Sequence, residues 1–429
     1  MSNRRFDNRV WRWLASVYEV CRREFSLVFH DEGVIIFFLV LCAVYPVMYS
    51  LVYNTEVARD VPVVVVDDDR SASTREFARA LDATSELCVT HYVANMGEAR
   101  RLMNEHACCA VLHFPAGYDR DLMRGEQATV EVFCDMGLVL RYKQVLTAVT
   151  GVQQDFNTRI QKEMLSVVPL SMPQNTISNE QVALGNTAMG LASAVLPAIL
   201  VLVLQQSMLL GICMLHGGSR ERRLVNRGND PLEVPAGVIA SILGKSLCYL
   251  MIYIVPTVYV LHFVPIFFDF PQNGRLLHVL LLSFPFLLAT SFMGQALKVF
   301  VNDRESTFIA IVFTSVVFVF LSGISWPRYA MSALWLAVGN VVPSTWAVEA
   351  YIAIQSNGAT LAQQSHAYLM LWVLCGVMFV FAYLVERFLC RRRYRRMRHY
   401  AKRDAQALLR EEYRRQAVDI TEDRPLDTP

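Results

Sequence analysis

Six long apolar runs restrict what this chain can fold into. A helix needs about 20 apolar residues to cross the roughly 30 Å of hydrocarbon in a membrane. The runs lie at residues 33–53, about 184–214, 236–265, 276–300, 307–325 and 368–390. Hydrophobic residues make up 54% of the sequence and charged residues 18%, below the roughly 25% of a soluble domain. The sequence therefore predicts a polytopic α-helical membrane protein with six transmembrane helices.

The segment before the first run, residues 1–32, has an amphipathic pattern. Apolar residues between positions 8 and 30 recur with a helical period, and arginines fall on the other faces. This pattern favours a helix that lies along the membrane surface, although a helix packed on a soluble core has the same period. No small-residue cleavage site follows the run at 33–53, so we interpret that run as a retained first span and not as a signal peptide.

Residues 54–183, between the first two runs, are more polar and alternate between two kinds of pattern. Strands are predicted at 61–69, 87–93, 108–114 and 129–135. The patterns Ser73-x-x-Glu76 and Asn95-x-x-Glu98 predict two helix starts, and a long helical stretch follows at about 138–165. Strands that alternate with helices predict an α/β domain with an at least partly parallel sheet, inserted between the first two spans.

Three short segments rich in arginine determine the orientation of the spans. They are the N-terminal segment, the loop at 216–235 and the tail at 391–429. With six spans, all three fall on one side of the membrane, and basic residues favour the cytoplasmic side. We therefore expect both termini and the 216–235 loop in the cytoplasm, and the α/β domain outside it.

Residues 326–352 are apolar but interrupted, by Pro327, Gly339 and Pro343. The pieces between these breaks are too short to cross a membrane. They predict re-entrant or interfacial helices on the outer side, which are tolerated where protein buries them. Glu349 in this region either lines a pathway or forms a structural ion pair, and the sequence leaves both readings open.

The sequence lacks the patterns of an enzyme or of a metal site. Residues 244–246 are Gly-Lys-Ser, the end of a phosphate-binding loop pattern, but Ile239 stands where that loop needs glycine. The aspartates of residues 66–70 lack the spacing of a calcium-binding loop. We therefore expect no catalytic residue, no metal and no bound cofactor in this chain.

Four cysteines of the α/β domain are either thiols or disulfide partners: Cys88, Cys108, Cys109 and Cys134.

The tail directly after the last run is the most basic part of the chain. Beside a membrane span, such a cluster fits anionic lipid headgroups better than nucleic acid, so we expect lipid contacts and no nucleic-acid partner. The residues expected to contact headgroups are Arg391, Arg392, Arg393, Arg395, Arg396 and Arg398. A short charged helix is expected after them.

Two motifs resemble those of the permease subunits of ABC-2 type exporters. Residues 321–352, "LSGISWPRYAMSALWLAVGNVVPSTWAVEAYI", follow that family's order of LSG, a proline-bearing turn, an apolar helix and P-x-T-W. Residues 219–224, "SRERRL", occupy the place of its E-R-E-x-G-T motif, with the Arg-Glu pair kept and the first Glu, the Gly and the Thr replaced. The resemblance covers nearly the whole chain and is to the bacterial subgroup with a large domain between the first two spans.

The resemblance implies roles for two sets of residues. The loop between spans two and three would hold a helix, at 219–234, that docks into an ATPase subunit. Its implied docking residues are Ser219, Arg220, Glu221, Arg222, Arg223 and Leu224. Spans two and five would line the transport path, and the 326–352 helices would close its outer end. The implied residues of this outer gate are Trp326, Pro327, Pro343, Thr345, Trp346 and Glu349.

The expectation is therefore the permease subunit of an ATP-driven exporter in the bacterial cytoplasmic membrane. ATP and Mg²⁺ would bind to a separate ABC ATPase, and the permease would pair with a second copy of itself or with a sister permease. A periplasmic adaptor is a further expected partner, and spans without central charges favour a hydrophobic or amphipathic substrate. The alternative is a membrane-anchored sensor or scaffold whose extracytoplasmic domain binds a ligand or partner. A sensor would need a cytoplasmic output domain, yet no predicted cytoplasmic segment exceeds about 40 residues.

Overall fold

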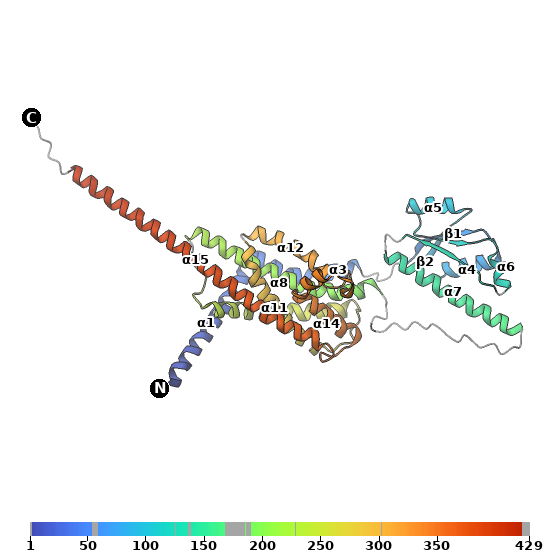
Figure 1. The fold of residues 1–429 in the computed structure, drawn as a ribbon, viewed down its shortest axis with the longest axis horizontal. Helices are drawn as coiled ribbons and strands as arrows, with labels where there is room; N and C mark the ends of the chain where they lie inside the picture. The colour runs from blue at the N-terminus through green and yellow to red at the C-terminus, as the bar shows by residue number, and fades with distance from the viewer. Residues whose placement is uncertain are drawn as a thin grey trace, which may run out of the picture. The chain divides into compact units, whose positions relative to one another are not determined.

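The computed structural model describes residues 2–53, 59–124, 126–135, 139–167, 185, 190–227, 229–301 and 303–422. These residues form two compact units, a helical bundle and an α/β unit that lies between the first two spans in the sequence (Figure 1). Six helices of the bundle are long and apolar enough to cross a membrane, so the predicted fold class is confirmed. These candidate spans are Glu32–Val52, Ala192–Val225, Val238–Phe267, Leu276–Phe300, Arg304–Leu321 and Ser365–Arg395.

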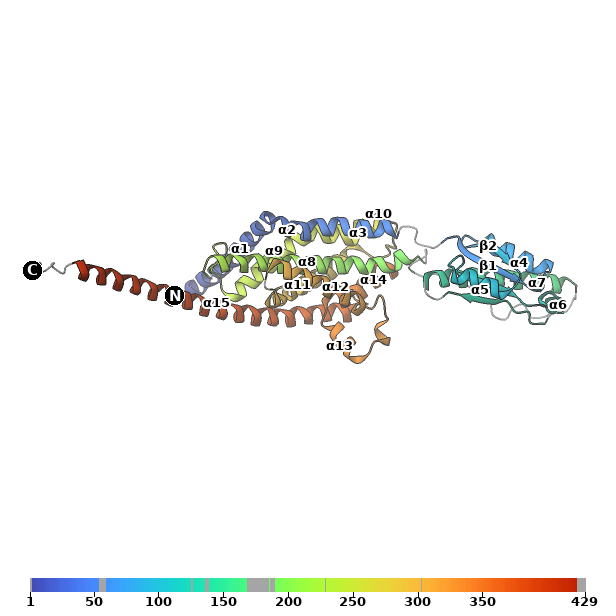
Figure 2. The ribbon, with the colours of Figure 1, turned by 90° about the horizontal axis from the view of Figure 1, so that it is seen from above.

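The bundle is built almost entirely from helices, several of which are joined end to end. Before the α/β unit it contains α1 (Ser2–His30), α2 (Glu32–Ile35), the π-helical η1 (Ile36–Val40) and α3 (Leu41–Val52). After it come α8 (Leu191–Val225), α9 (Val238–Val258), the π-helical η2 (Tyr259–Phe263), α10 (Val264–Phe267), α11 (Leu276–Leu297), η3 (Lys298–Phe300) and α12 (Arg304–Leu321). The chain ends with η4 (Arg328–Ala330), α13 (Ala333–Asn340), α14 (Pro343–Asn357) and α15 (Ser365–Glu422). Figure 2 shows α13 at the side of the bundle.

Helix α8 forms the centre of the bundle. In the most apolar part of this helix 83% of the residues are buried, against 18% for α12. Its buried side chains belong to one continuous apolar core that also includes residues of α9, α11, α14 and α15. A displacement of α8 therefore has to be accommodated by most of the other helices, because close-packed cores do not deform freely.

Two helices continue well beyond the length that a membrane requires. Helix α8 has 35 residues and α15 has 58, which correspond to about 52 Å and 87 Å at 1.5 Å per residue. Residues 219–224 therefore lie in the last turns of α8, and the expected separate helix over 219–234 is wrong, because residues 229–237 are not helical. The expected short helix of the tail is likewise a continuation of α15 (Figure 1).

Helix α1 packs against α9, at the position of Gly244. A Cβ atom at Gly244 would lie 2.7 Å from the carbonyl oxygen of Val17 and 2.9 Å from Val20, so only glycine permits this approach. Of the recurring apolar residues between positions 8 and 30, Cys21 and Val28 are buried, whereas residues 10, 13, 14 and 25 are exposed. The structure thus supports packing on protein for the second half of α1.

The α/β unit has a four-stranded sheet in the order β2-β1-β3-β4. Strand β1 (Val61–Asp67) pairs in parallel with β2 (Leu87–Val93) and β3 (Ala110–Phe114), and β3 pairs antiparallel with β4 (Glu131–Cys134). The predicted partly parallel sheet is confirmed. Its helices are α4 (Ala72–Asp82), α5 (Met96–Asn104), α6 (Tyr118–Met123) and α7 (Val139–Val167). Side chains of α4, α6 and α7 cover one face and those of α5 the other, which explains why β1 is a continuous valine run.

One of the two predicted helix starts in this unit is confirmed and the other is shifted. The Asn95 side chain accepts a hydrogen bond from the Glu98 backbone N–H at 2.8 Å and caps α5. At α4 the capping residue is Ser71, and the Ser73 hydroxyl instead donates to Asp119 at 2.5 Å. Helix α6 was not predicted, because it has only six residues and no repeated apolar stripe.

Candidate functional site

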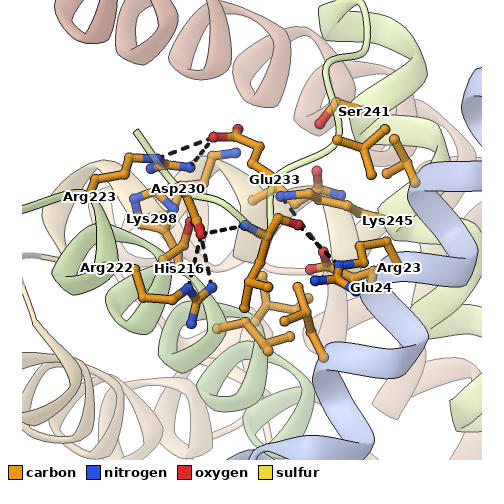
Figure 3. A pocket seen from close by; sticks show the side chains of 18 of the residues that line it. Arg23, Glu24, His216, Arg222, Arg223, Asp230, Glu233, Ser241, Lys245 and Lys298 are labelled. Carbon is orange, nitrogen blue, oxygen red and sulfur yellow. Dashed lines mark hydrogen bonds and ion pairs between the residues drawn. The ribbon is translucent and has the colours of Figure 1, made fainter. Parts of the chain in front are cut away.

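Charged side chains gather around a cavity of about 50 Å³ at the end of the bundle where α8 stops. We call this region the charged end; it comprises the last turns of α8, residues 229–234, and the parts of α1, α9, η3 and α15 that contact them. Figure 3 shows Arg222 and Asp230 on one side of the cavity and Arg23, Glu24 and Lys245 on the other. Hydrogen bonds and ion pairs join these elements to one another.

Asp230 fixes the chain after α8 against the helix itself. Its carboxylate accepts hydrogen bonds from Ser219 Oγ at 2.6 Å and from two nitrogens of Arg222 at 3.0 and 3.2 Å. The backbone N–H of Leu232 donates a further bond at 3.0 Å. Burial alone would raise the pKa of Asp230, but the hydrogen bonds from Arg222 and Ser219 outweigh it and lower that pKa below its ordinary value.

Glu233 joins the same segment to α8 and α15. It accepts from Arg223 Nη2 at 2.8 Å and from Arg393 Nη1 at 2.5 Å. Burial opposes its ionised form, but the two guanidinium groups outweigh that effect and lower the pKa of Glu233.

Lys298 and Glu386 form an ion pair in the interior of the charged end. Each side chain is only 4% exposed, and Arg393 Nη2 lies 3.7 Å from the Glu386 carboxylate. These contacts connect η3, which follows α11, to α15. Because a buried charge is costly without its partner, the pair holds the two helices in one arrangement.

Helix α1 enters the charged end through Arg23 and Glu24. The Tyr249 hydroxyl of α9 donates a hydrogen bond to the buried Glu24 carboxylate, and Lys245 Nζ lies 4.0 Å from that carboxylate. Arg23 Nε donates to the carbonyl oxygen of Leu232 at 3.3 Å. The helix before the first span is therefore connected to α9 and to the segment after α8.

A second group of contacts joins α8 to the start of α12. The Arg220 side chain donates to the carbonyl oxygen of Val301 at 2.9 Å, and the Glu221 carboxylate accepts from the backbone N–H of Arg304 at 3.0 Å. The Arg304 guanidinium donates two bonds to Asp31, at 2.7 and 3.1 Å. Glycines 217 and 218 allow this approach, since Cβ atoms there would lie 3.0 Å or less from residues 303 and 304.

Five of the six predicted docking residues, 219–223, thus have partners inside the chain. Leu224 differs, because it is 64% exposed, and the next residue, Val225, is 82% exposed. Sequence reasoning missed Asp31, Asp230, Lys298 and Glu386 as members of the site. One available signal was Glu386, which is an acidic residue inside the last apolar run.

A smaller cluster surrounds Arg328, in the predicted outer gate; we call Arg328, Asn340, Trp346 and Glu349 the Arg328 cluster. The Arg328 guanidinium forms an ion pair with Glu349 and donates to Asn340 Oδ1 at 2.6 Å. It also lies over the Trp346 ring, 4.3 Å from the centroid, and Trp346 Nε1 donates to the Asn340 carbonyl oxygen at 3.0 Å. Of the two readings left open for Glu349, the structure contains the ion pair.

The other predicted gate residues lie on either side of this cluster. Trp326 and Pro327 precede η4, and the exposed Trp326 ring donates to the Ala330 carbonyl oxygen at 3.1 Å. Pro343 and Thr345 are buried in the first turn of α14, where the neighbouring Ser344 N–H donates to Gln205 of α8 at 2.8 Å. Of the predicted gate residues, Trp346 and Glu349 are thus brought together by their shared contact with Arg328.

The basic residues of the tail lie along α15. Those that are exposed are Arg391, Arg392, Arg395 and Arg398. Arg393 instead turns toward Glu233 and Glu386. The side chain of Arg396 lies outside the described residues. Arg393 is therefore part of the charged end. For the exposed arginines, contact with lipid headgroups stays a prediction.

The acidic loop after β1 binds the protein's own backbone. Asp67 accepts from the Arg70 N–H at 2.8 Å, and Asp69 accepts from the Gly117 and Asp119 N–H groups at 2.8 and 3.1 Å. Among the described residues, no group of three or more His, Cys, Asp or Glu side chains is arranged to hold a metal ion. The cysteines that the structure contains are free thiols.

The fold and these contacts define a multi-pass membrane protein in which an α/β unit interrupts a six-span bundle. The model of the family described as ABC-2 family transporter protein matches residues 33–384, which run from the start of the first candidate span into the sixth. The chain belongs to this family of membrane transport permeases, and the resemblance stated from the sequence is confirmed. Membership implies association with an ABC ATPase and often dimerisation. A search of curated proteins gave no match.

Proposed function

We infer that this chain is the membrane subunit of an ATP-driven exporter and that its ATPase docks on the tip of α8. The observation that carries this proposal is the pair Leu224 and Val225. Both are large apolar side chains, both are exposed, and both follow directly after residues that are fastened to the bundle. Exposed apolar residues within a charged surface are typical of the centre of a protein–protein interface.

The charged end gives the ATPase a means of moving the bundle. Ser219 and Arg222 hold the segment 229–234, Arg223 reaches α15 through Glu233, and Glu221 reaches α12. A force on the tip of α8 would therefore act on α1, α12 and α15 together. Because α8 is also the most buried span, its displacement would open or close the space between the helices.

The proposed direction of transport follows from the arginine distribution. Because basic segments favour the cytoplasmic side, we expect the charged end and the ATPase in the cytoplasm and the α/β unit outside it.

Spans two and five, α8 and α12, would line the transport path, and the Arg328 cluster would close its outer end. The largely unburied α12 leaves an apolar face for a hydrophobic or amphipathic substrate, and for a second copy or a sister permease. The α/β unit would receive a periplasmic adaptor.

Co-purification with the ATPase tests this proposal. The variant Leu224→Asp with Val225→Asp places charge on the tip without removing a hydrogen bond within the described chain. Met123→Asp, at an equally exposed apolar residue of α6, is the matched control. We expect wild type and the control to retain a vanadate-sensitive ATPase in mild detergent, and the double variant to lose at least ten-fold. Equal recovery with the double variant would contradict docking at this tip.

A further inference from the structure

The cavity at the charged end is surrounded by more basic than acidic side chains. The basic residues that line it or contact its lining are Arg23, Arg222, Arg223, Lys245, Lys298 and Arg393. The acidic ones are Glu24, Asp230, Glu233 and Glu386. Six cations and four carboxylates therefore surround the cavity, an excess of two positive charges.

One of the two excess charges lies on the side of the cavity formed by α1 and α9, where Arg23 and Lys245 face Glu24 alone. Asp230 is bound by Arg222, and Glu233 is shared by two arginines. Glu24 already accepts the Tyr249 hydroxyl, and Lys245 lies 4.0 Å away, beyond hydrogen-bond distance. Arg23 donates to a carbonyl oxygen and contacts no carboxylate in the described chain. An anion bound near Arg23 and Lys245 would balance this excess charge.

Two polar side chains of the same cavity have hydrogen-bonding atoms without a partner in the described part of the chain. His216 makes no hydrogen bond to the part of the chain that the structure describes. Gln295 is 1% exposed; its amide nitrogen donates to Ser246 Oγ at 2.7 Å, but its carbonyl oxygen Oε1 is buried and unpartnered. The cavity volume of about 50 Å³ exceeds the roughly 10–15 Å³ that one water requires. The cavity therefore offers cations together with one buried hydrogen-bond acceptor.

We propose that this cavity is a binding site for a phosphate group that carries a proton, either inorganic phosphate or a phosphate monoester. Its negative oxygens would face Lys245, Arg23 and His216, and its P–OH would donate to Gln295 Oε1. Sulfate has the same shape and charge but no O–H at neutral pH, so Gln295 would discriminate against it. The site goes beyond the proposed ATPase docking and does not depend on it, because none of these four residues lies at the tip of α8.

Phosphate binding can be measured on the full chain in phosphate-free detergent. We expect phosphate to raise the thermal unfolding midpoint saturably, and sulfate at equal ionic strength to be at least ten-fold less effective. Lys245→Met should lose the phosphate response, and Arg392→Gln, on the exposed tail, should keep it. His216→Leu removes no hydrogen bond within the described chain and should weaken the response to phosphate several-fold. This variant tests the proposal even if Lys245→Met does not fold.

A second pair of measurements separates the two sources of the phosphate group. The delipidated chain is titrated with ³²P-labelled inorganic phosphate, and in parallel with micelles that contain phosphatidic acid or, as a control, phosphatidylglycerol. Binding of inorganic phosphate supports a soluble ligand, and binding of phosphatidic acid alone supports a lipid headgroup. If neither binds, if sulfate matches phosphate, or if Lys245→Met and His216→Leu both respond as wild type does, the proposal is overturned.

Discussion

The two polar clusters of the bundle differ in how many elements they join. The charged end connects α1, α8, α9, η3 and α15, and its central pair, Lys298 and Glu386, is almost fully buried. The Arg328 cluster joins only residues 328–349, which are close in sequence, and Glu349 is 47% exposed. Helix α15 runs between these regions, since it starts after α14 and reaches Glu386 about 32 Å further on.

This difference indicates different mechanical roles. Partners far apart in sequence hold their helices in one arrangement, so the charged end should move as a unit. Partners on one short segment, in contact with solvent, can separate at a much lower cost in free energy. In the proposed transport cycle the charged end would transmit movement, and the Arg328 cluster would be the contact that opens.

The largest expected effect is that of Glu386→Gln. This change leaves Lys298 buried without its carboxylate, and we expect a loss of about 3–5 kcal/mol in the free energy of unfolding. The double variant Lys298→Met with Glu386→Leu removes both charges and should recover most of that loss. Thermal unfolding in detergent measures both, and a single variant as stable as wild type would show that the pair does not organise the charged end.

Gly244→Val tests the attachment of α1 to the charged end. The new side chain would overlap Val17 and Val20, and we expect a loss of about 1–3 kcal/mol, together with faster proteolysis of α1. Gly376→Val is the matched control on α15, where a Cβ atom would meet nothing within 4 Å. Equal proteolysis rates in the two variants would mean that α1 is not held through Gly244.

Arg328→Ala should have a smaller effect than Glu386→Gln. It removes a partly exposed ion pair, one hydrogen bond and the contact with the Trp346 ring, which together suggest about 1–2 kcal/mol. Acrylamide quenching should reveal greater exposure of Trp346, with Trp346→Phe as the reference. If Arg328→Ala destabilises the protein as much as Glu386→Gln does, the proposed difference between the two clusters is wrong.

The smallest expected effect is an acid dependence of the charged end. The pKa values of Asp230 and Glu233 are lowered in the folded chain, so both groups stabilise it above their unfolded values of about 3.9 and 4.3. This contribution is lost as the pH falls through the lowered values. Asp230→Asn should therefore flatten the fall of the unfolding midpoint below about pH 4, and an unchanged pH profile would exclude Asp230 as its source.

The sequence predicts best what depends on local pattern. Apolar run length determines the six spans, and alternating strands and helices determine the α/β unit. The continuation of α8 through residues 219–225 was also accessible, because arginine, glutamate and leucine are good helix formers and no proline interrupts them. The Gly217-Gly218 pair suggests a break there, but in the fold it serves close packing against residues 303 and 304.

The contacts of the site could not be predicted in the same way. Lys298 and Glu386 are 88 positions apart, and Glu24 is 225 positions from Tyr249. No local pattern specifies such pairs, because they depend on which helices become neighbours. Arg328 was missed for a different reason, since its partners are near in sequence but meet it only where the chain folds back from η4 through α13 to α14.

The central claim is that movement at the tip of α8 reaches α15 through the charged end. Amide hydrogen exchange of the permease–ATPase complex, with and without a non-hydrolysable ATP analogue, tests it most directly. We predict that exchange changes together in residues 219–237 and around residues 386–393, and that Glu386→Gln abolishes the second change alone. A change confined to residues 219–237 in the wild-type complex would contradict it.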